Sequence, residues 1–339
     1  MSPRTLIVLA LIALLAGGGA LTLSLLEPRP AQVQLDGAPV LPGLADRLPE
    51  VQRIAVEVSD QPGVVLARAG DGWRVASEHG YPARTERVNR LLVGLANLEK
   101  IAPKTADPER FARLAVGDPA DDPLARRVTL TGDDGTEIAR LIVGKQRHEL
   151  TGRAASGTYV RVPGGQRAWL AAGLADLADD AYPFLDTAVI DLPAGAIRRI
   201  EIARVGGGRL VAVRPAENAP ALAIADVPQG RQLDVAAVRR LGSLLTGIKF
   251  DRVEPAAALE GATRVADATV TTFDGLELKV RAVDRDGRFW LTLSAAADRP
   301  SATEAAARLD ARVDGWAYMV ADYIAERLTR TRADVLLAD

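Results

Sequence analysis

The sequence of 339 residues has no cysteine, only two histidines and two methionines, and an aromatic content of 4%. Without cysteine the chain has no disulfide, no thiolate metal ligand, no cysteine nucleophile and no lipid-modified cysteine. His79 and His148 are too few for a three-histidine metal site. These absences exclude several kinds of active site before any motif is considered.

The sequence also lacks an excess of one charge sign. It has 42 Lys and Arg residues and 44 Asp and Glu residues, which gives a formal net charge of -2. Proteins that bind nucleic acid usually carry a basic surface that neutralises phosphates. We therefore expect no nucleic-acid partner. The length suggests about two domains, with enough chain to bury sizeable cores.

One long hydrophobic run stands at the N-terminus. Leu6–Leu26 has no charged residue, and 21 helical residues span roughly 30 Å, the thickness of a bilayer core. Arg4 precedes the run and favours a cytoplasmic N-terminus. We expect residues 1–27 to be a single-pass anchor in a bacterial inner membrane, with the bulk of the chain in the periplasm.

A cleaved signal peptide is the alternative for this segment. Its apolar region would be Leu6–Leu15, and the small residues from Ala16 to Ala20 would hold the cleavage site. The hydrophobic run continues to Leu26, past that site, which favours an uncleaved anchor. Residues 28–50 are rich in proline and predict a linker between the anchor and the globular part.

The remaining chain contains two similar patterns of strands and helices. In the first pattern, alternating residues and turn dipeptides predict an antiparallel meander, and Thr85 is expected to cap an amphipathic helix. About 146 residues later the order returns, with Asp234 as the helix cap. The first meander comprises Ile54–Val58, Val64–Arg68 and Trp73–Val75; the second begins with Ile200–Ile202 and Leu210–Arg214.

The helices of both patterns have one apolar face, and further hairpins follow each helix. The second helix would present Val238, Leu241, Leu245 and Ile248. Hairpins follow at Asp134-Gly135 and Asp274-Gly275. The order predicts an α+β fold: the N-terminal transmembrane helix, then two repeated units of antiparallel sheet plus amphipathic helix. The units are expected at 51–192 and 193–339, the second with a C-terminal helix.

The motifs that would indicate catalysis are weak or missing. The chain has no phosphate-binding Gly-x-x-x-x-Gly-Lys-Ser/Thr loop and no Gly-x-Ser-x-Gly elbow. Asp133-Asp134 and Asp179-Asp180 are adjacent pairs, and neighbours on a strand point to opposite faces, which is poor geometry for acid–base chemistry. We interpret Asp133-Asp134 as part of a hairpin turn. We expect no enzyme, no catalytic residue, no cofactor and no metal.

Several short motifs occur together in a distinctive order. They are Gly80-Tyr81-Pro82-Ala83, Arg87–Leu92, Glu99–Leu114, Gly157–Arg161, Trp169-Leu170, Gly315–Tyr318 and Tyr323. With this order and spacing, the chain resembles the bacterial domain of unknown function numbered 4340, over roughly Val51 to Leu337.

The resemblance implies a single-anchor envelope protein of the kind encoded beside an ABC-2-type permease, its ATPase and a gliding-motility-type auxiliary protein. The family has no established catalytic residues, so none is carried over. This sequence departs from a regular duplication at one point. The strand that carries Trp73 in the first repeat corresponds to Ala221–Ala225 in the second, so an aromatic surface at Trp73 would not be duplicated.

Three functions remain open at the sequence level. We favour a non-enzymatic, membrane-anchored periplasmic accessory protein of an ABC-type export system, which would contact the permease and an auxiliary envelope protein. A periplasmic glycan- or peptide-binding module is the alternative, and an envelope hydrolase is the third. The aromatic residues that would form a partner or ligand surface, or equally anchor the core, are Trp73, Tyr81, Trp316, Tyr318 and Tyr323.

Overall fold

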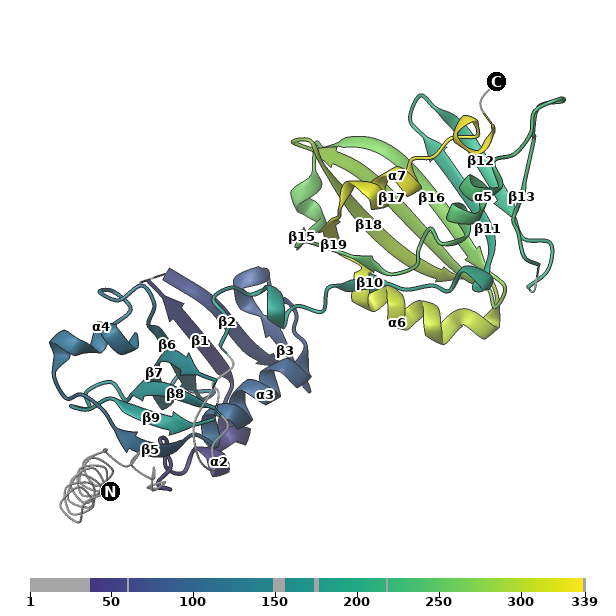
Figure 1. Ribbon diagram of the computed structural model, residues 1–339. Helices are drawn as coiled ribbons and strands as arrows, with labels where there is room; N and C mark the ends of the chain where they lie inside the picture. The colour runs from purple at the N-terminus through teal and green to yellow at the C-terminus, as the bar shows by residue number, and fades with distance from the viewer. Residues whose placement is uncertain (1–36, 60, 149–155, 174–176, 218, 338–339) are drawn as a thin grey trace, which may run out of the picture. The chain divides into compact units, whose positions relative to one another are not determined.

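The computed structural model describes residues 37–59, 61–148, 156–173, 177–217 and 219–337 (Figure 1). These residues form an α+β fold with mostly antiparallel sheets and few helices, as expected. The predicted anchor Leu6–Leu26 and residues 28–36 of the predicted linker lie outside them. The rest of the linker is folded, with Val40 and Leu44 buried. Within the described residues, no helix combines the length and apolar character needed to span a membrane.

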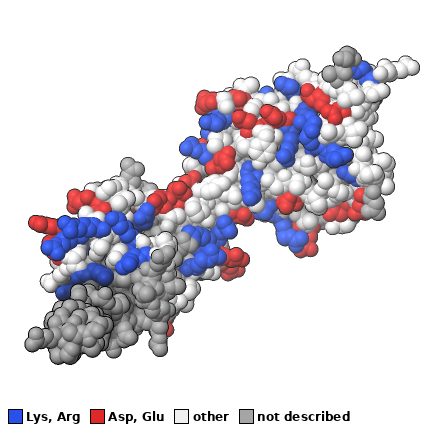
Figure 2. Space-filling view, viewed as in Figure 1, with Lys and Arg blue, Asp and Glu red and all other residues white. Residues whose placement is uncertain are grey.

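Close contacts divide the chain into two compact units. One contains residues 1–63 and 89–179, and the other contains 64–88 and 180–339. In the view of Figure 2, basic and acidic side chains lie intermingled on the described surface.

The first sheet has nine strands in the order β4-β3-β2-β1-β6-β7-β8-β9-β5. The pairs β1–β6, β2–β3, β3–β4, β5–β9, β6–β7, β7–β8 and β8–β9 are antiparallel. The strands are β1 (Arg53–Val58), β2 (Gln61–Ala69), β3 (Gly72–Val75), β4 (Tyr81–Pro82), β5 (Glu99–Pro103), β6 (Arg126–Thr131), β7 (Glu137–Arg147), β8 (Gly157–Arg161) and β9 (Trp169–Ala172). The α-helices in this part of the sequence are α2 (Leu44–Arg47), α3 (Thr85–Ala96) and α4 (Phe111–Leu114).

The second sheet has eight strands in the order β13-β12-β11-β16-β17-β18-β19-β15. Apart from β4, this order matches that of the first sheet strand for strand. The strands are β11 (Ile197–Arg204), β12 (Gly208–Val213), β13 (Ala223–Ile224), β15 (Arg252–Pro255), β16 (Thr263–Thr272), β17 (Leu276–Arg285), β18 (Arg288–Ala297) and β19 (Trp316–Met319). A separate pair joins β10 (Ala188–Ile190) to β14 (Ile248–Lys249). The helices are α5 (Val235–Gly242), α6 (Thr303–Val313) and α7 (Asp322–Leu328).

Period-two alternation gives the second sheet one apolar and one polar face. Along β17, Leu278, Val280 and Ala282 are buried and alternate with charged residues. The helices α6 and α7 pack on β16–β18 (Figure 1). They bury Ala306 and Ile324 respectively. The core therefore lies on the apolar face of the sheet.

Most of the predicted elements are confirmed, and one helix is shorter than expected. Asp234 caps α5 as predicted, because its carboxylate accepts hydrogen bonds from the N–H groups of Ala236 and Ala237 at 2.8 and 3.1 Å. The prediction that the helix reaches Ile248 is wrong. The helix ends at Gly242, and a turn with Gly247 at φ +63° leads Ile248 into β14.

The two sheets differ in the length of the connection that leads into β6 in the first sheet and into β16 in the second. Between β5 and β6 the chain has 22 residues (104–125), and between β15 and β16 it has seven (256–262). The long connection, here called the cover segment, packs Phe111, Val116 and Ala125 against Ile142 of β7 and Ala168. The short connection forms a single 3-10 turn whose Leu259 packs on Val283 and Trp290.

Candidate functional site

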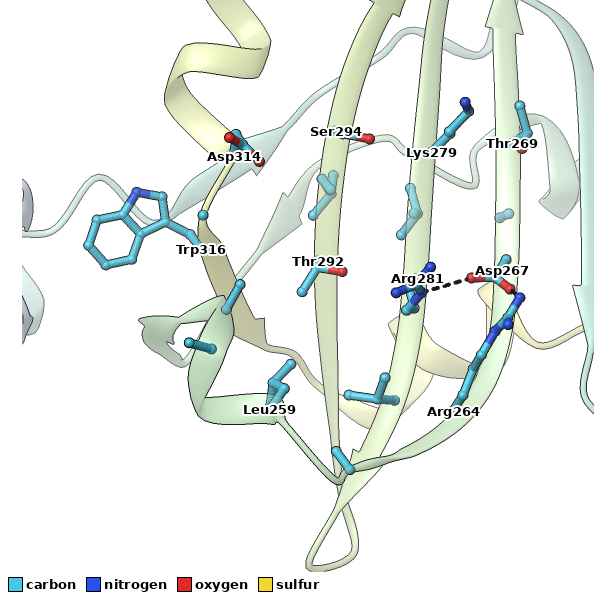
Figure 3. A pocket seen from close by; sticks show the side chains of 18 of the residues that line it. Leu259, Arg264, Asp267, Thr269, Lys279, Arg281, Thr292, Ser294, Asp314 and Trp316 are labelled. Carbon is cyan, nitrogen blue, oxygen red and sulfur yellow. Dashed lines mark hydrogen bonds and ion pairs between the residues drawn. The ribbon is translucent and has the colours of Figure 1, made fainter.

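The polar face of the second sheet carries a broad concavity of about 930 Å³. Its floor consists of side chains from β16, β17 and β18 (Figure 3). We call this surface the open face and define it by Asp267, Thr269, Lys279, Arg281, Thr292 and Ser294.

The register of the strands explains why these residues lie together. Asp267 is paired with Arg281, and Arg281 is paired in turn with Thr292. In the next row, Thr269 is paired with Lys279 and Lys279 with Ser294. Because side chains alternate between faces along a strand, two rows at i and i+2 share one face. The result is a grid of charged and hydroxyl groups on the side away from the core.

Ion pairs hold the carboxylates of this grid. Asp267 accepts a hydrogen bond from Nε of Arg281 at 3.2 Å and also pairs with Arg264. Next to it on β11, Glu201 pairs with Arg209 at 2.5 Å and with Arg199 at 3.2 Å. Hydrogen bonds from Arg209 and then Arg199 hold the pKa of Glu201 below its usual value, so this carboxylate is ionised at neutral pH.

The lining of the concavity also includes Leu259, Glu260, Asp314 and Trp316, which come from the segments beside the three strands. Trp316 is the aromatic residue of the lining, and its side chain points away from the strands of the open face (Figure 3). Its ring instead meets the ring of Tyr81 edge to face, at a centroid distance of 5.0 Å. The open face therefore offers charge and hydroxyl groups rather than a stacking platform.

Three of the aromatic residues singled out in the sequence meet in one cluster. The ring of Tyr81 contacts those of Trp316, Tyr318 and Phe250, and Phe250 lies 5.3 Å from Tyr81 and 5.4 Å from Tyr318 between ring centroids. Tyr81 is 2% exposed and Tyr318 is fully buried, whereas Trp316 is half-buried. Burial raises the pKa of both tyrosines. The cluster is thus mainly a core feature with one partly exposed member.

The other two predicted residues lie elsewhere. Trp73 is buried on β3, where the Arg68 guanidinium sits 4.9 Å from its ring centroid. Tyr323 on α7 is 55% exposed, with Arg327 at 5.2 Å from its ring. A partner surface at the five aromatic residues stays a prediction, and Trp316 and Tyr323 are the members with accessible rings.

The carboxylate pairs considered as catalytic candidates have local partners. Asp179 receives two hydrogen bonds from Arg126, one of them at 2.7 Å, and this guanidinium lowers the pKa of Asp179. Asp180 accepts from the Tyr182 N–H at 3.0 Å. Asp134 accepts from the Thr136 N–H at 2.9 Å, which confirms the predicted hairpin turn. In the part of the chain that the structure describes, no three His, Asp or Glu residues are arranged to hold a metal ion.

Sequence reasoning missed the open face. The signal was present, because charged or hydroxyl residues alternate with apolar ones at 267, 269 and 271, at 277, 279 and 281, and at 292 and 294. That pattern indicates a half-buried strand, and it does not reveal whether another segment covers the polar side.

Comparison with known proteins gives one match. The family model described as Domain of unknown function (DUF4340) matches residues 73–265, more than half of the chain. No curated protein and no solved structure matches it.

Proposed function

The chain belongs to the DUF4340 family, whose description assigns no function, and we propose that it is a non-enzymatic periplasmic accessory protein of an ABC-type export system. The proposal places it in the bacterial inner membrane through Leu6–Leu26, with the N-terminus in the cytoplasm. Its partners would be the permease and an auxiliary envelope protein.

The observation that carries this proposal is the open face of the second sheet. It is broad and accessible, and its carboxylate Asp267 is paired with Arg264 and Arg281. Reaction sites in enzymes are usually enclosed and contain titratable groups with strongly shifted pKa values that suit proton transfer. An accessible grid of paired charges and hydroxyl groups fits a surface that recognises another molecule.

A periplasmic glycan-binding module is a second candidate, and one observation favours it. Half-buried Trp316 is part of the lining of the concavity that also contains Thr292 and Ser294. Sugars combine hydroxyl contacts with an aromatic platform. The direction of the Trp316 ring, away from the strands, weighs against this function (Figure 3).

Co-purification tests the accessory function. We expect the full-length chain with a C-terminal affinity tag to fractionate with membranes and, after mild detergent extraction, to retain the neighbouring permease. Replacing residues 1–27 by an unrelated single-span anchor is the matched control. It should leave the association intact if the periplasmic part makes the contact. A protein that purifies alone while the permease is intact contradicts the proposal.

A further inference from the structure

We propose that the open face binds an acidic segment of a protein partner. This inference rests on the proposed accessory function and names the chemistry of the contact. It starts from the charges that the sheet presents to the outside. On the strands they are Arg199, Glu201, Arg209, Arg264, Asp267, Glu277, Lys279 and Arg281, five cations and three anions, and the exposed Glu260 and Asp314 of the connecting segments bring the two signs to five each.

On the strands, the cationic side chains are more exposed to solvent than the carboxylates. The side chains of the five cations are 42–66% exposed, whereas those of the three carboxylates are 26–30% exposed. Asp267 and Glu201 each lie beneath two arginines. Above the strands, a molecule therefore meets guanidinium and ammonium groups first, and anionic groups are favoured at this part of the surface, away from Glu260 and Asp314.

Pairing with the sheet's own carboxylates does not exhaust the donors. A guanidinium has five N–H groups in a planar fork, and Arg281 uses its Nε on Asp267. Lys279 lies 3.5 Å from Glu277 and carries a mobile ammonium group with three donors. Thr292 and Ser294 add hydroxyl groups in the adjacent row. The face thus suits carboxylates that arrive with neighbouring polar backbone groups.

The first sheet shows what kind of ligand this position of the fold accepts. There the cover segment lies on the matching side of the sheet, and it contains five acidic and three basic residues within 104–125. Its Asp118 lies 3.2 Å from Arg127 on β6 and 3.8 Å from Arg161 on β8. An acidic polypeptide segment on sheet arginines is therefore already built into this chain once.

The strand register relates the two faces residue by residue. Thr129 of β6 and Thr269 of β16 occupy matching positions in the two sheets. Thr129 is paired with Arg140 and Thr269 with Lys279, so Arg140 of the first sheet is equivalent to Lys279 of the second. The same counting makes Arg281 equivalent to Ile142, which is fully buried under the cover segment. The second sheet has a cation where the first has a covered isoleucine. An arginine in place of the isoleucine suits a face that stays in contact with solvent until a charged partner binds.

Glycans and membranes fit this surface less well. Trp316 points away from the strands, so no ring is available for a sugar to stack upon (Figure 3). Glu260 and Asp314 are exposed in the lining of the concavity, where they would repel a flat anionic lipid surface that covered all of it. A narrow acidic polypeptide can lie along the cations of the strands without covering Glu260 and Asp314, whereas a flat membrane surface would have to approach all of these groups together.

Fluorescence anisotropy with defined peptides tests the inference on the detergent-solubilised full-length protein. The probe is a labelled 16-residue peptide of alternating Glu and Ser, compared with the Gln/Ser and Lys/Ser peptides of the same length. We expect the Glu/Ser peptide to bind more tightly than both, with an affinity that falls as salt rises. Equal binding of the Glu/Ser and Gln/Ser peptides would overturn the proposal.

Charge-reversal variants locate the contact. The double variant Lys279→Glu, Arg281→Glu should weaken binding of the Glu/Ser peptide by about tenfold or more, because close charges across an interface couple strongly. Arg140→Glu changes the equivalent position of the first sheet and should have little effect. An equal loss in both variants would overturn the assignment to the open face. So would displacement of the peptide by phosphatidylglycerol vesicles or by a uronic-acid oligosaccharide.

The two proposals fail separately. If the double variant still co-purifies with the permease and the wild-type chain does not bind the acidic peptide, the accessory function stands and the acidic segment is wrong. If the peptide binds as expected but the permease never co-purifies, the open face keeps its ligand chemistry and the proposed transport partner is wrong.

Discussion

Replacing Tyr318 by alanine is expected to lower the free energy of unfolding by about 3–5 kcal/mol, the usual loss for a large buried aromatic side chain. Tyr318 is fully buried on β19 and packs against Phe250 and Tyr81. Its strand neighbours are Leu291 on β18 and Val253 on β15. Truncation would open a cavity that joins three strands and an aromatic cluster. Urea unfolding followed by tryptophan fluorescence measures the loss.

Tyr318→Phe is the control for this substitution. The Tyr318 hydroxyl is buried next to that of Tyr81, and within the described residues it makes no hydrogen bond of good geometry. Removing a buried hydroxyl without a partner costs little, so we expect this variant to stay within about 1 kcal/mol of the wild type. A stable Tyr318→Ala protein that loses only partner binding would contradict the core role and restore the residue to the surface predicted from the sequence.

The same pair of variants predicts a change with pH. Because burial raises the pKa of Tyr318, the folded chain holds the phenolic proton more tightly than the unfolded chain. The stability that this provides is complete below the unfolded pKa of about 10 and falls as the pH rises above it. Tyr318→Phe should therefore lose less stability than the wild type in alkaline buffer. Burial keeps the pKa of Tyr81 raised in both proteins, and loss of the Tyr318 hydroxyl, which lowers that pKa, does not reverse the direction.

Local signals predicted the secondary structure well. Alternation at Ile54–Val58 and Ile200–Ile202 gave β1 and β11, and the Asp-Gly dipeptides gave the hairpin turns after β6 and β16. Asp234 was recognised as a helix cap because its carboxylate and the first helical N–H groups are neighbours in sequence. Such features depend on a few consecutive residues, so they are readable without knowledge of the fold.

Contacts between distant segments were not predictable in the same way. Trp73 and Trp316 are both on short four-residue strands, yet one is buried and the other half-buried. The polar sides of β6 and β16 also look alike in sequence, but only the first sheet receives a 22-residue cover segment. Whether a polar strand face is solvated depends on packing of a segment elsewhere in the chain. The candidate site emerged from that packing difference.

Gly144 of β7 distinguishes the first sheet, which the cover segment covers, from the second sheet. Its substitution is expected to have a large effect on stability. A Cβ atom at Gly144 of β7 would stand 2.2 Å from the carbonyl oxygen of Leu114 and 2.6 Å from that of Ala115. Both carbonyls belong to the cover segment. In the register of the second sheet the equivalent residue is Val283, where the connection is short. Glycine therefore permits the close seating of the cover segment on β7.

Gly144→Val is expected to destabilise the protein by about 3 kcal/mol, because the clash involves backbone atoms that a rotamer change cannot move away. The cover segment would have to lift, and Phe111 and Val116 would lose their packing on Ile142. Lys145 would also lose its hydrogen bond to the carbonyl of Arg113, now 3.0 Å. Urea unfolding measures the loss, and trypsin cleavage after Arg110 and Arg113 under native conditions should become faster as the segment opens.

Gly195→Ala provides the comparison, since a Cβ atom there has no heavy atom within 4 Å. That variant should change stability by less than about 0.5 kcal/mol and leave the tryptic pattern unaltered. If Gly144→Val kept both the wild-type stability and the protection of Arg110 and Arg113, the cover segment would not be seated on β7. The contrast between a covered first sheet and an open second sheet would then lose its physical basis, and with it the reason to assign the partner to the second.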